Sequence, residues 1–366
     1  MGKKVDIIIP AYKAHKTIFK TLCSIAQQIN TEEILVTIVN DCCPEGDYKE
    51  IIRRFKNQLD IQEIKLKKNG GPGVARQYGI DNTKNDYILF MDADDVYTNC
   101  FAVYRFIRGL EEQQVDFMTS DFVEEKPDES IIYHSKDIVW MFGKIYKRKF
   151  LEEQNIRFTT ARANEDTCFN QKVILALINQ DKEIACLDEN TYVWRFKENS
   201  ITRVNNGQYA YDQSIVGYIE GMIDVFHWAE KMGIRKEIID EKIKNIMFNL
   251  YVNYCDVGSN SEIFQRQNFE FIKKFYNEIW KPRNLDYKNA EFMEAFNQGM
   301  LDLNTDGTPY TIFMAQPNIV QFMDMLENSP YNEKDIYKIW EELPEEIKQN
   351  NVKCGVVDKK YYVEKK

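Results

Sequence analysis

Three carboxylates lie close together in the amino-terminal half of the chain. Asp92, Asp94 and Asp95 stand around a single small residue, Ala93, directly after the apolar run 87–91. Acidic side chains at this spacing repel one another unless a cation neutralises them, and carboxylate oxygens suit Mg²⁺ or Mn²⁺. A solvated acidic turn has the same composition. The cluster therefore indicates either a cation site or an exposed turn.

Polar and small residues follow two earlier apolar runs in the same way. Pro10, Ala11 and Tyr12 follow the run 5–9, and Asp41 comes just after the next one. Tyr12 could stack on a nucleotide base or simply pack, and Asp41 could accept a hydrogen bond from a base or serve as an ordinary loop residue. In open α/β sheets, ligands bind beyond the carboxyl ends of the strands. These residues are therefore candidates for one shared pocket.

A glycine-rich segment, 70–73, opens a predicted helix that carries Arg76. Glycine lets the backbone approach a ligand closely, and a helix N-terminus favours anions. The segment is not a dinucleotide-binding fingerprint, because it follows the third predicted strand and lacks the Gly-x-Gly-x-x-Gly spacing. Arg76 could face a phosphate or merely a surface acid.

A second acidic group, Glu165 and Asp166, begins a later predicted helix. Acids in the first turn complement the helix dipole, which is a purely structural role. A positioned carboxylate can also take a proton from an alcohol and act as a general base. The residues alone leave both roles open.

The elements that position these residues alternate regularly at the start of the chain. Each run of β-branched residues ends at a loop. After each of the first three runs, apolar residues recur at the spacing of a helix. This β-α-β alternation predicts an α/β fold with a mostly parallel sheet and helices on both faces. The predicted strands are 5–9, 34–39, 61–66 and 87–91, and the predicted helices between them are 15–28, 47–55 and 70–82.

The pattern changes after residue 95. We expect a helix at 99–113, a hairpin of 116–123 with 131–134, a short helix at 147–154, a helix from 164, and strands at 183–187 and 191–196. From about residue 209 only helical periodicity remains, near 209–232, 235–256, 261–279, 286–298, 317–327 and 333–349. The predicted domains are 1–210, a helical region 211–350 and a tail 351–366.

Composition narrows the classes of function. The chain has 366 residues and a formal net charge of −10, which weighs against a broad nucleic-acid-binding surface. No apolar run is long enough to span a membrane, and the first residues offer no signal peptide, so we expect a cytoplasmic protein, with a peripheral position at the inner membrane surface as the alternative. Eight scattered cysteines without Cys-x-x-Cys, and only three histidines, disfavour a zinc site.

Taken together, these motifs resemble the family 2 glycosyltransferases, which are inverting enzymes with the GT-A fold that use nucleotide-sugar donors. The resemblance covers roughly residues 4–205, and nothing in 210–366 resembles a family. The matching segments are 7–12, 39–41, 69–79, 90–95, 143–148, 164–166, 192–195 and 200–203.

The resemblance implies a role for each matching position. Asp94 would coordinate a divalent cation, Mn²⁺ or Mg²⁺, with Asp92 at the ribose or at the metal. Asp166 would be the general base, with Glu165 beside it. The remaining implied contacts are all to the donor, a nucleotide-diphosphate sugar, and they are Pro10, Ala11, Tyr12, Asp41, Gly73, Arg76, Ala93, and Arg195 or Arg203 at the leaving diphosphate.

Two departures from the family pattern stand out. Many relatives carry Asp-Asp-Gly-Ser where this chain has 40–43, Asn-Asp-Cys-Cys, so one acidic contact is absent. Many also supply a histidine ligand after the base, whereas no histidine lies between His134 and His227. Donor base and metal ligation therefore stay open.

The expected activity is transfer of a sugar to a hydroxyl of a glycan or glycoconjugate. Two alternatives remain: an enzyme that glycosylates modified bases in DNA, which would use a basic group comprising Lys144, Lys147, Arg148, Lys149, Arg157 and Arg162, and a non-catalytic module that binds sugar nucleotides or glycans. The carboxy-terminal helices could complete the acceptor side or form a homo-oligomer contact.

Overall fold

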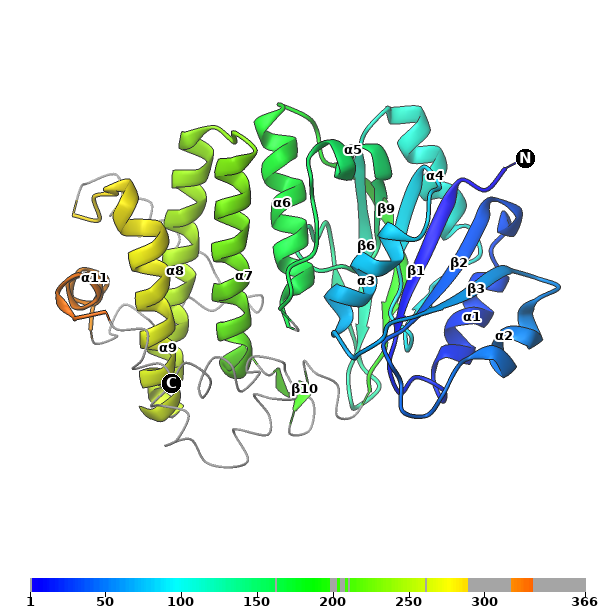
Figure 1. Cartoon of the computed structure of the whole chain (residues 1–366), viewed down its shortest axis with the longest axis horizontal. Helices are drawn as coiled ribbons and strands as arrows, with labels where there is room; N and C mark the ends of the chain where they lie inside the picture. The colour runs from blue at the N-terminus through cyan, green and yellow to red at the C-terminus, as the bar shows by residue number, and fades with distance from the viewer. Residues whose placement is uncertain are drawn as a thin grey trace. The chain divides into compact units, whose positions relative to one another are not determined.

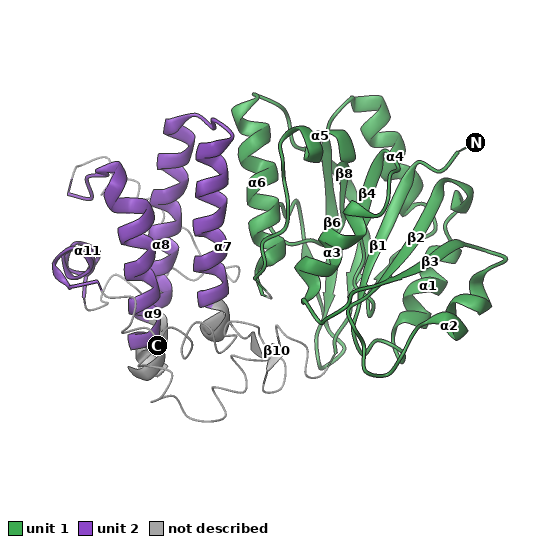
Figure 2. Cartoon of the chain, viewed as in Figure 1, with its two compact units in different colours: residues 1–210 green, residues 211–366 purple. Residues whose placement is uncertain are grey.

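The computed structural model describes residues 2–161, 163–197, 203–204, 208–209, 211–260, 262–288 and 317–331. The chain divides into two compact units, Met1–Ala210 and Tyr211–Lys366 (Figure 2). The predicted helix at 333–349, the tail and most of the predicted helix at 286–298 lie outside the described residues.

The described part of the first unit is built on a nine-stranded sheet (Figure 1). Its order is β3-β2-β1-β4-β8-β6-β9-β5, and β7 pairs with β6. The strands are β1 Val5–Ala11, β2 Ile34–Asn40, β3 Asp60–Lys65, β4 Tyr87–Phe90, β5 Val96–Tyr97, β6 Phe117–Glu125, β7 Ile131–His134, β8 Lys144–Lys147 and β9 Ala185–Trp194. Two short strands, β10 Arg203–Val204 and β11 Gln208–Tyr209, pair separately.

The first four strands in the sheet order run parallel. Ala11 at the end of β1 pairs with Asn40 at the end of β2, and Ile8 pairs with Phe90 at the end of β4. The three strands therefore finish at one edge of the sheet, as the sequence pattern predicts. The predicted α/β class is confirmed.

Helices cover both faces of this sheet. On one face, Ile7 and Ile9 of β1 share a core with α1 and α4. On the other, α3 packs on β1 and β2, and Phe90 of β4 packs against Phe169 of α6. The helices are α1 Ile18–Ala26, η1 Thr31–Glu33, α2 Lys49–Phe55, α3 Pro72–Asp81, α4 Ala102–Gln113, α5 Arg148–Glu153 and α6 Glu165–Asn179.

Parts of the sheet differ from the sequence prediction. Residues 144–147 form β8, which inserts antiparallel between β4 and β6. Its central residues Ile145 and Tyr146 are fully buried, and four residues buried on both faces carry no readable periodicity. The two strands predicted at 183–187 and 191–196 are one strand, β9, whose pairing with β6 is irregular around Asp121.

The described part of the second unit is helical, as expected. Tyr251 of α8 packs its ring against Phe322 of α11 at 5.4 Å and donates a hydrogen bond to the carbonyl of Pro317 at 3.0 Å. No helix in the described ranges is both long and apolar enough to cross a membrane. The elements are α7 Tyr211–Lys231, α8 Lys236–Asn260, α9 Glu262–Phe275, the π-helical turn η2 Tyr276–Trp280, η3 Lys281–Arg283 and α11 Ile319–Asn328.

Candidate active site

The loops after β1, β2 and β4 carry the predicted donor-binding residues at the shared sheet edge. Pro10 and Ala11 complete β1, with Ala11 buried, and Tyr12 follows with 44% of its surface exposed. Asp41, after β2, is buried. Ala93, after β4, is also buried. Tyr12 is thus an accessible aromatic ring at the edge where ligands of such sheets bind.

The carboxylate of Asp41 holds the glycine segment. One oxygen accepts the backbone N–H of Gly70 at 2.7 Å, and the other accepts that of Gly71 at 2.8 Å. Asn69 donates from its side chain to the Asp41 carbonyl at 3.2 Å. Asp41 therefore ties the loop after β2 to the start of α3, a contact that sequence reasoning did not foresee.

Arg76 lies at the centre of the arrangement. Its guanidinium is buried and donates to Glu165 Oε1 at 2.6 Å and to Asp92 Oδ1 at 2.6 Å. Burial acts to lower the pKa of Arg76, but the charges of Asp92, Glu165 and Asp166 outweigh it and raise the pKa above its usual value. Arg76 is a permanent cation that joins the end of β4 to the start of α6.

Burial also shifts the two acids that begin α6. Burial and the charge of Asp166 raise the pKa of Glu165 to about 8, although Arg76 opposes this shift. The half-buried Asp166 has its pKa raised by burial, again against the pull of Arg76, while its Oδ1 accepts the N–H of Thr167 at 2.8 Å. A carboxylate with a raised pKa is a stronger base, which suits removal of a proton from a hydroxyl.

Gly73 lies where α3 and α6 meet. A Cβ at this position would stand 2.7 Å from Glu165 Cγ and 3.2 Å from the carbonyl oxygen of Thr159. The glycine therefore lets the two helix starts approach closely enough for Arg76 to reach Glu165.

The three carboxylates at the end of β4 have three different partners. Asp92 pairs with Arg76, and the half-buried Asp94 pairs with Lys197 Nζ at 2.9 Å. Asp95 is buried, accepts the Tyr192 hydroxyl at 2.6 Å and accepts the backbone N–H of Arg195 at 2.8 Å. Only Asp92 and Asp94 are therefore accessible to a ligand.

These two carboxylates fit a hard divalent cation. Both present oxygen ligands of the kind that Mg²⁺ and Mn²⁺ prefer. The pKa of Asp95 is raised well above its usual value by burial and then by the charges of Asp94 and Asp92. Asp95 thus lies in the electrostatic field of the two accessible carboxylates.

Sequence reasoning missed two residues of this site. Lys197 follows β9, whose pairing with β5 places it beside the turn after β4. Tyr192 lies on β9 and accepts the N–H of Asp92 at 3.2 Å. The resemblance implied Arg195 or Arg203 at the leaving diphosphate. Arg195 has its Nε 3.6 Å from Glu125, and the side chain of Arg203 lies outside the described residues. In the sequence, the one feature that could have pointed to Lys197 is its positive charge two residues after Arg195.

Residues 6–169 match the model of a family described as glycosyl transferase family 2. This range includes the residues just described from Asp41 to Asp166. Over residues 6–169, the chain is therefore similar to glycosyl transferase family 2. The resemblance seen in the sequence is confirmed for this part of the chain.

Two bacterial proteins are among the curated relatives that resemble this part of the chain. Glycosyltransferase GlyA of Streptococcus pneumoniae is 24% identical over 230 residues, which are 55% of this chain and 32% of the relative. Poly(ribitol-phosphate) beta-N-acetylglucosaminyltransferase TarS of Staphylococcus aureus is 26% identical over 212 residues, which are 53% of this chain and 36% of TarS. The chain thus spans about a third of the length of these relatives.

Solved structures resemble the chain more loosely. A crystal structure of S. aureus TarS 1-349 in complex with UDP-GlcNAc has a TM-score of 0.49 and 17% identity, covering 98% of this chain and 89% of that one. A mannosyltransferase from Pyrobaculum calidifontis in complex with GDP-Man and Mn2+ has a TM-score of 0.47 and 11% identity, covering 100% and 89%. These scores are too low to add to the fold that the sheet order itself shows.

The described members of the basic group considered for a DNA acceptor range from buried to exposed. Each described member has an acidic partner within this chain, and Arg162 lies outside the described residues. Lys144 and Arg148 are buried. The pairs are Lys144 with Asp137, Lys147 with Asp116, Arg148 with Asp6, Lys149 with Glu153 and Arg157 with Asp81.

Proposed function

We propose that this chain is an inverting glycosyltransferase that moves a sugar from a nucleotide-diphosphate donor to a hydroxyl of a glycan or glycoconjugate. The observation that carries the proposal is the buried Arg76, bonded to Asp92 on the donor side and to Glu165 at the start of α6. The family 2 match over 6–169 supports the same activity.

The donor would bind along the edge where β1, β2 and β4 end. Tyr12 would stack on the base, beside Pro10, Ala11 and the loop that Asp41 holds. Asp94, with Asp92, would hold a divalent cation whose charge neutralises the donor diphosphate. Lys197 adds a positive charge next to Asp94. Arg195 and Arg203 stay candidates for the same role.

The acceptor would be activated at the start of α6. Asp166 would take the proton of the acceptor hydroxyl as the oxygen attacks the anomeric carbon. The bond from that carbon to the diphosphate breaks, and its electron pair leaves with the nucleoside diphosphate. A single displacement inverts the anomeric centre and needs no covalent enzyme intermediate. Arg76 would keep Glu165 and Asp92 in place, so that base and donor face each other.

Matched substitutions in the full chain test this division of roles. With a panel of nucleotide-sugar donors and glycan or ribitol-phosphate acceptors, Asp166→Asn should reduce transfer by at least about a hundredfold, because the base is lost. Asp166→Asn should keep donor binding, measured by calorimetry in the presence of Mn²⁺. Asp94→Ala should weaken donor binding itself.

Asp188→Asn, at an exposed position of β9, is the matched control and should leave both measurements unchanged. Full transfer by Asp166→Asn and Asp94→Ala would overturn the proposed mechanism. Donor binding by the wild-type chain without transfer to any acceptor would favour the non-catalytic binding module instead.

A further inference from the structure

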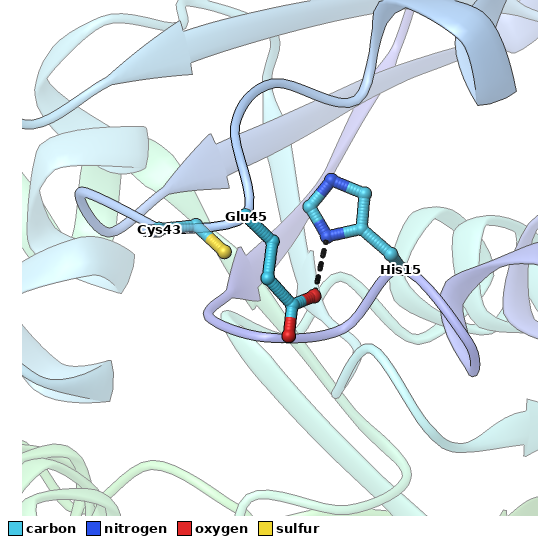
Figure 3. Close-up of side chains that lie close together, drawn as sticks. All are labelled: His15, Cys43 and Glu45. Carbon is cyan, nitrogen blue, oxygen red and sulfur yellow. Dashed lines mark hydrogen bonds and ion pairs between the residues drawn. The ribbon is translucent and has the colours of Figure 1, made fainter.

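Three side chains with metal-binding atoms meet beside the proposed base pocket. His15 lies between β1 and α1, whereas Cys43 and Glu45 lie in the loop after β2. One ligand atom of each side chain takes part: a ring nitrogen of His15, the Cys43 Sγ and a Glu45 carboxylate oxygen, which all lie within 4.8 Å of one another (Figure 3).

The hydrogen bonds of His15 assign the two nitrogens of its ring. Nε2 lies 2.9 Å from the carbonyl oxygen of Asp47, which can only accept, so Nε2 carries a hydrogen. Nδ1 then faces Glu45 Oε2 at 3.1 Å. With the hydrogen on Nε2, the Nδ1 lone pair and the Glu45 carboxylate are both electron-rich and repel each other at this distance. A cation between them, either a proton on Nδ1 or a metal ion, removes this repulsion. Metal-binding histidines usually donate their other N–H to such an acceptor.

The protein holds these groups in place before any ion binds. The His15 ring stacks on the fully buried Tyr48, with centroids 4.2 Å apart. The side chain of Asn40 accepts the N–H of Cys43 at 2.8 Å and donates to the Gly46 carbonyl at 3.0 Å, which fixes both ends of the loop that carries Glu45. Contacts with Tyr48 and Asn40 therefore hold His15 and the loop that carries Cys43 and Glu45 in place.

Cys43 is buried, and its sulfur has a backbone donor. The N–H of Lys13 points at Sγ from 3.2 Å. Such a hydrogen bond to sulfur stabilises a thiolate ligand. It also links the segment after β1 to the loop after β2 a second time, independently of His15.

We propose that His15, Cys43 and Glu45 form a Zn²⁺ site. A nitrogen, a sulfur and an oxygen ligand suit zinc, whereas Mg²⁺ and Mn²⁺ prefer oxygen alone. Zinc bonds of about 2.0–2.3 Å place ligand atoms about 3–4 Å apart, which the pair of His15 and Glu45 already matches. Glu45 is exposed and can move toward the ion, and a water would supply the fourth ligand of a tetrahedral site.

This inference does not depend on glycosyl transfer. The site lies apart from Asp94 in the sequence, and its ligands are chemically different. A bound zinc would tie together the two loops that carry Tyr12 and Asp41. Sequence spacing alone disfavoured such a site, because its ligands share no motif.

Zinc binding by the full chain, reduced and stripped of metal, tests the inference. Zn²⁺ is titrated against a chromophoric chelator, and Co²⁺ is then used as a spectroscopic probe. The wild type should bind one zinc ion per chain. Cys43→Ser and Glu45→Gln should each bind zinc at least about tenfold more weakly. The band from thiolate to Co²⁺ should disappear in Cys43→Ser and persist in Glu45→Gln.

Cys42→Ser is the matched control, since Cys42 lies in the same loop but its Sγ contacts the Lys67 carbonyl at 3.7 Å. This variant should bind zinc like the wild type. Equal zinc affinity in Cys43→Ser, Glu45→Gln and the wild type, or no thiolate band in the wild type, would overturn the site. Because Glu45 is exposed, Glu45→Gln remains informative even if Cys43→Ser does not fold.

Discussion

At the scale of single residues, Arg76 shows how a side chain's partners define its role. A cation one turn into a helix could face a phosphate or an acid, and in the structure it faces two acids, Asp92 and Glu165. Breaking a buried pair of this kind leaves an uncompensated charge, which is strongly destabilising. The two contacts of Arg76 thus lie within the protein, which supports the positioning role proposed for it.

The shifted pKa of Glu165 predicts a pH dependence of stability. Its folded pKa is about 8, compared with an ordinary value of 4.5, so the folded protein binds more protons than the unfolded chain between these values. The contribution of the protonated carboxyl is complete below the lower pKa and is lost as pH rises through the higher one. Glu165→Gln cannot ionise, so its free energy of unfolding should fall less than that of the wild type between about pH 5 and pH 9.

Urea denaturation at several pH values measures this difference. The difference in unfolding free energy between Glu165→Gln and the wild type should grow toward alkaline pH, by about 1.4 kcal/mol for each unit of pKa shift. Glu112→Gln, at an exposed position of α4, should follow the wild type. Parallel curves for Glu165→Gln and the wild type would show that Glu165 is already ionised near its ordinary pKa.

At the scale of elements, the close approach of α3 and α6 brings the two ends of the site together. Gly73 leaves room for Glu165 between these helices. The same contact places Arg76 within reach of both carboxylates. The geometry of the site thus depends on a helix pair whose members are far apart in the sequence.

Gly73→Ala should disturb this helix pair. The added Cβ would stand 2.7 Å from Cγ of the buried Glu165, whose carboxyl is held by the hydrogen bond from Arg76, so the helices must separate. We expect a loss of about 1–3 kcal/mol in unfolding free energy and a marked loss of transfer activity. Thermal denaturation and donor turnover measure the two effects.

Gly109→Ala is the matched control in α4. Its Cβ would meet the terminal carbon of Met118 at 2.6 Å, and a methionine end can rotate away. This variant should stay within about 1 kcal/mol of the wild type. Equal losses of unfolding free energy in Gly73→Ala and Gly109→Ala would contradict this expectation. They would mean that the start of α6 moves aside as easily as a methionine side chain.

At the scale of the whole molecule, the chain combines an α/β unit and a helical unit. The site residues described above all belong to the first unit, where three parallel strands end at one edge. A ligand at this edge should contact the loops after all three strands at once. The match to glycosyl transferase family 2 lies in the same unit.

Hydrogen exchange should report that shared edge. A nucleoside diphosphate with Mn²⁺ should slow exchange together in segments 11–15, 41–46, 69–76 and 92–95, because one ligand orders all of them. Segment 29–33, which precedes β2 at the opposite edge, is the internal control and should not change. Protection confined to one of the loops would contradict a common donor pocket.

The α/β class and the carboxyl-edge loops could be read from the sequence, because apolar runs and helical periods are local patterns. The glycine segment, the acids after β4 and the acids that begin α6 were visible for the same reason. Strand β8 was not, since a short strand buried on both faces has no period.

Contacts between distant residues came only from the tertiary structure. Asp95 turns inward to Tyr192, Asp94 meets Lys197, and Arg76 is enclosed by acids from two other elements. His15 meets Cys43 and Glu45 although no spacing rule connects them. Local sequence carries the propensity of each segment, whereas a site forms where packing of the whole sheet brings those segments within a few ångströms.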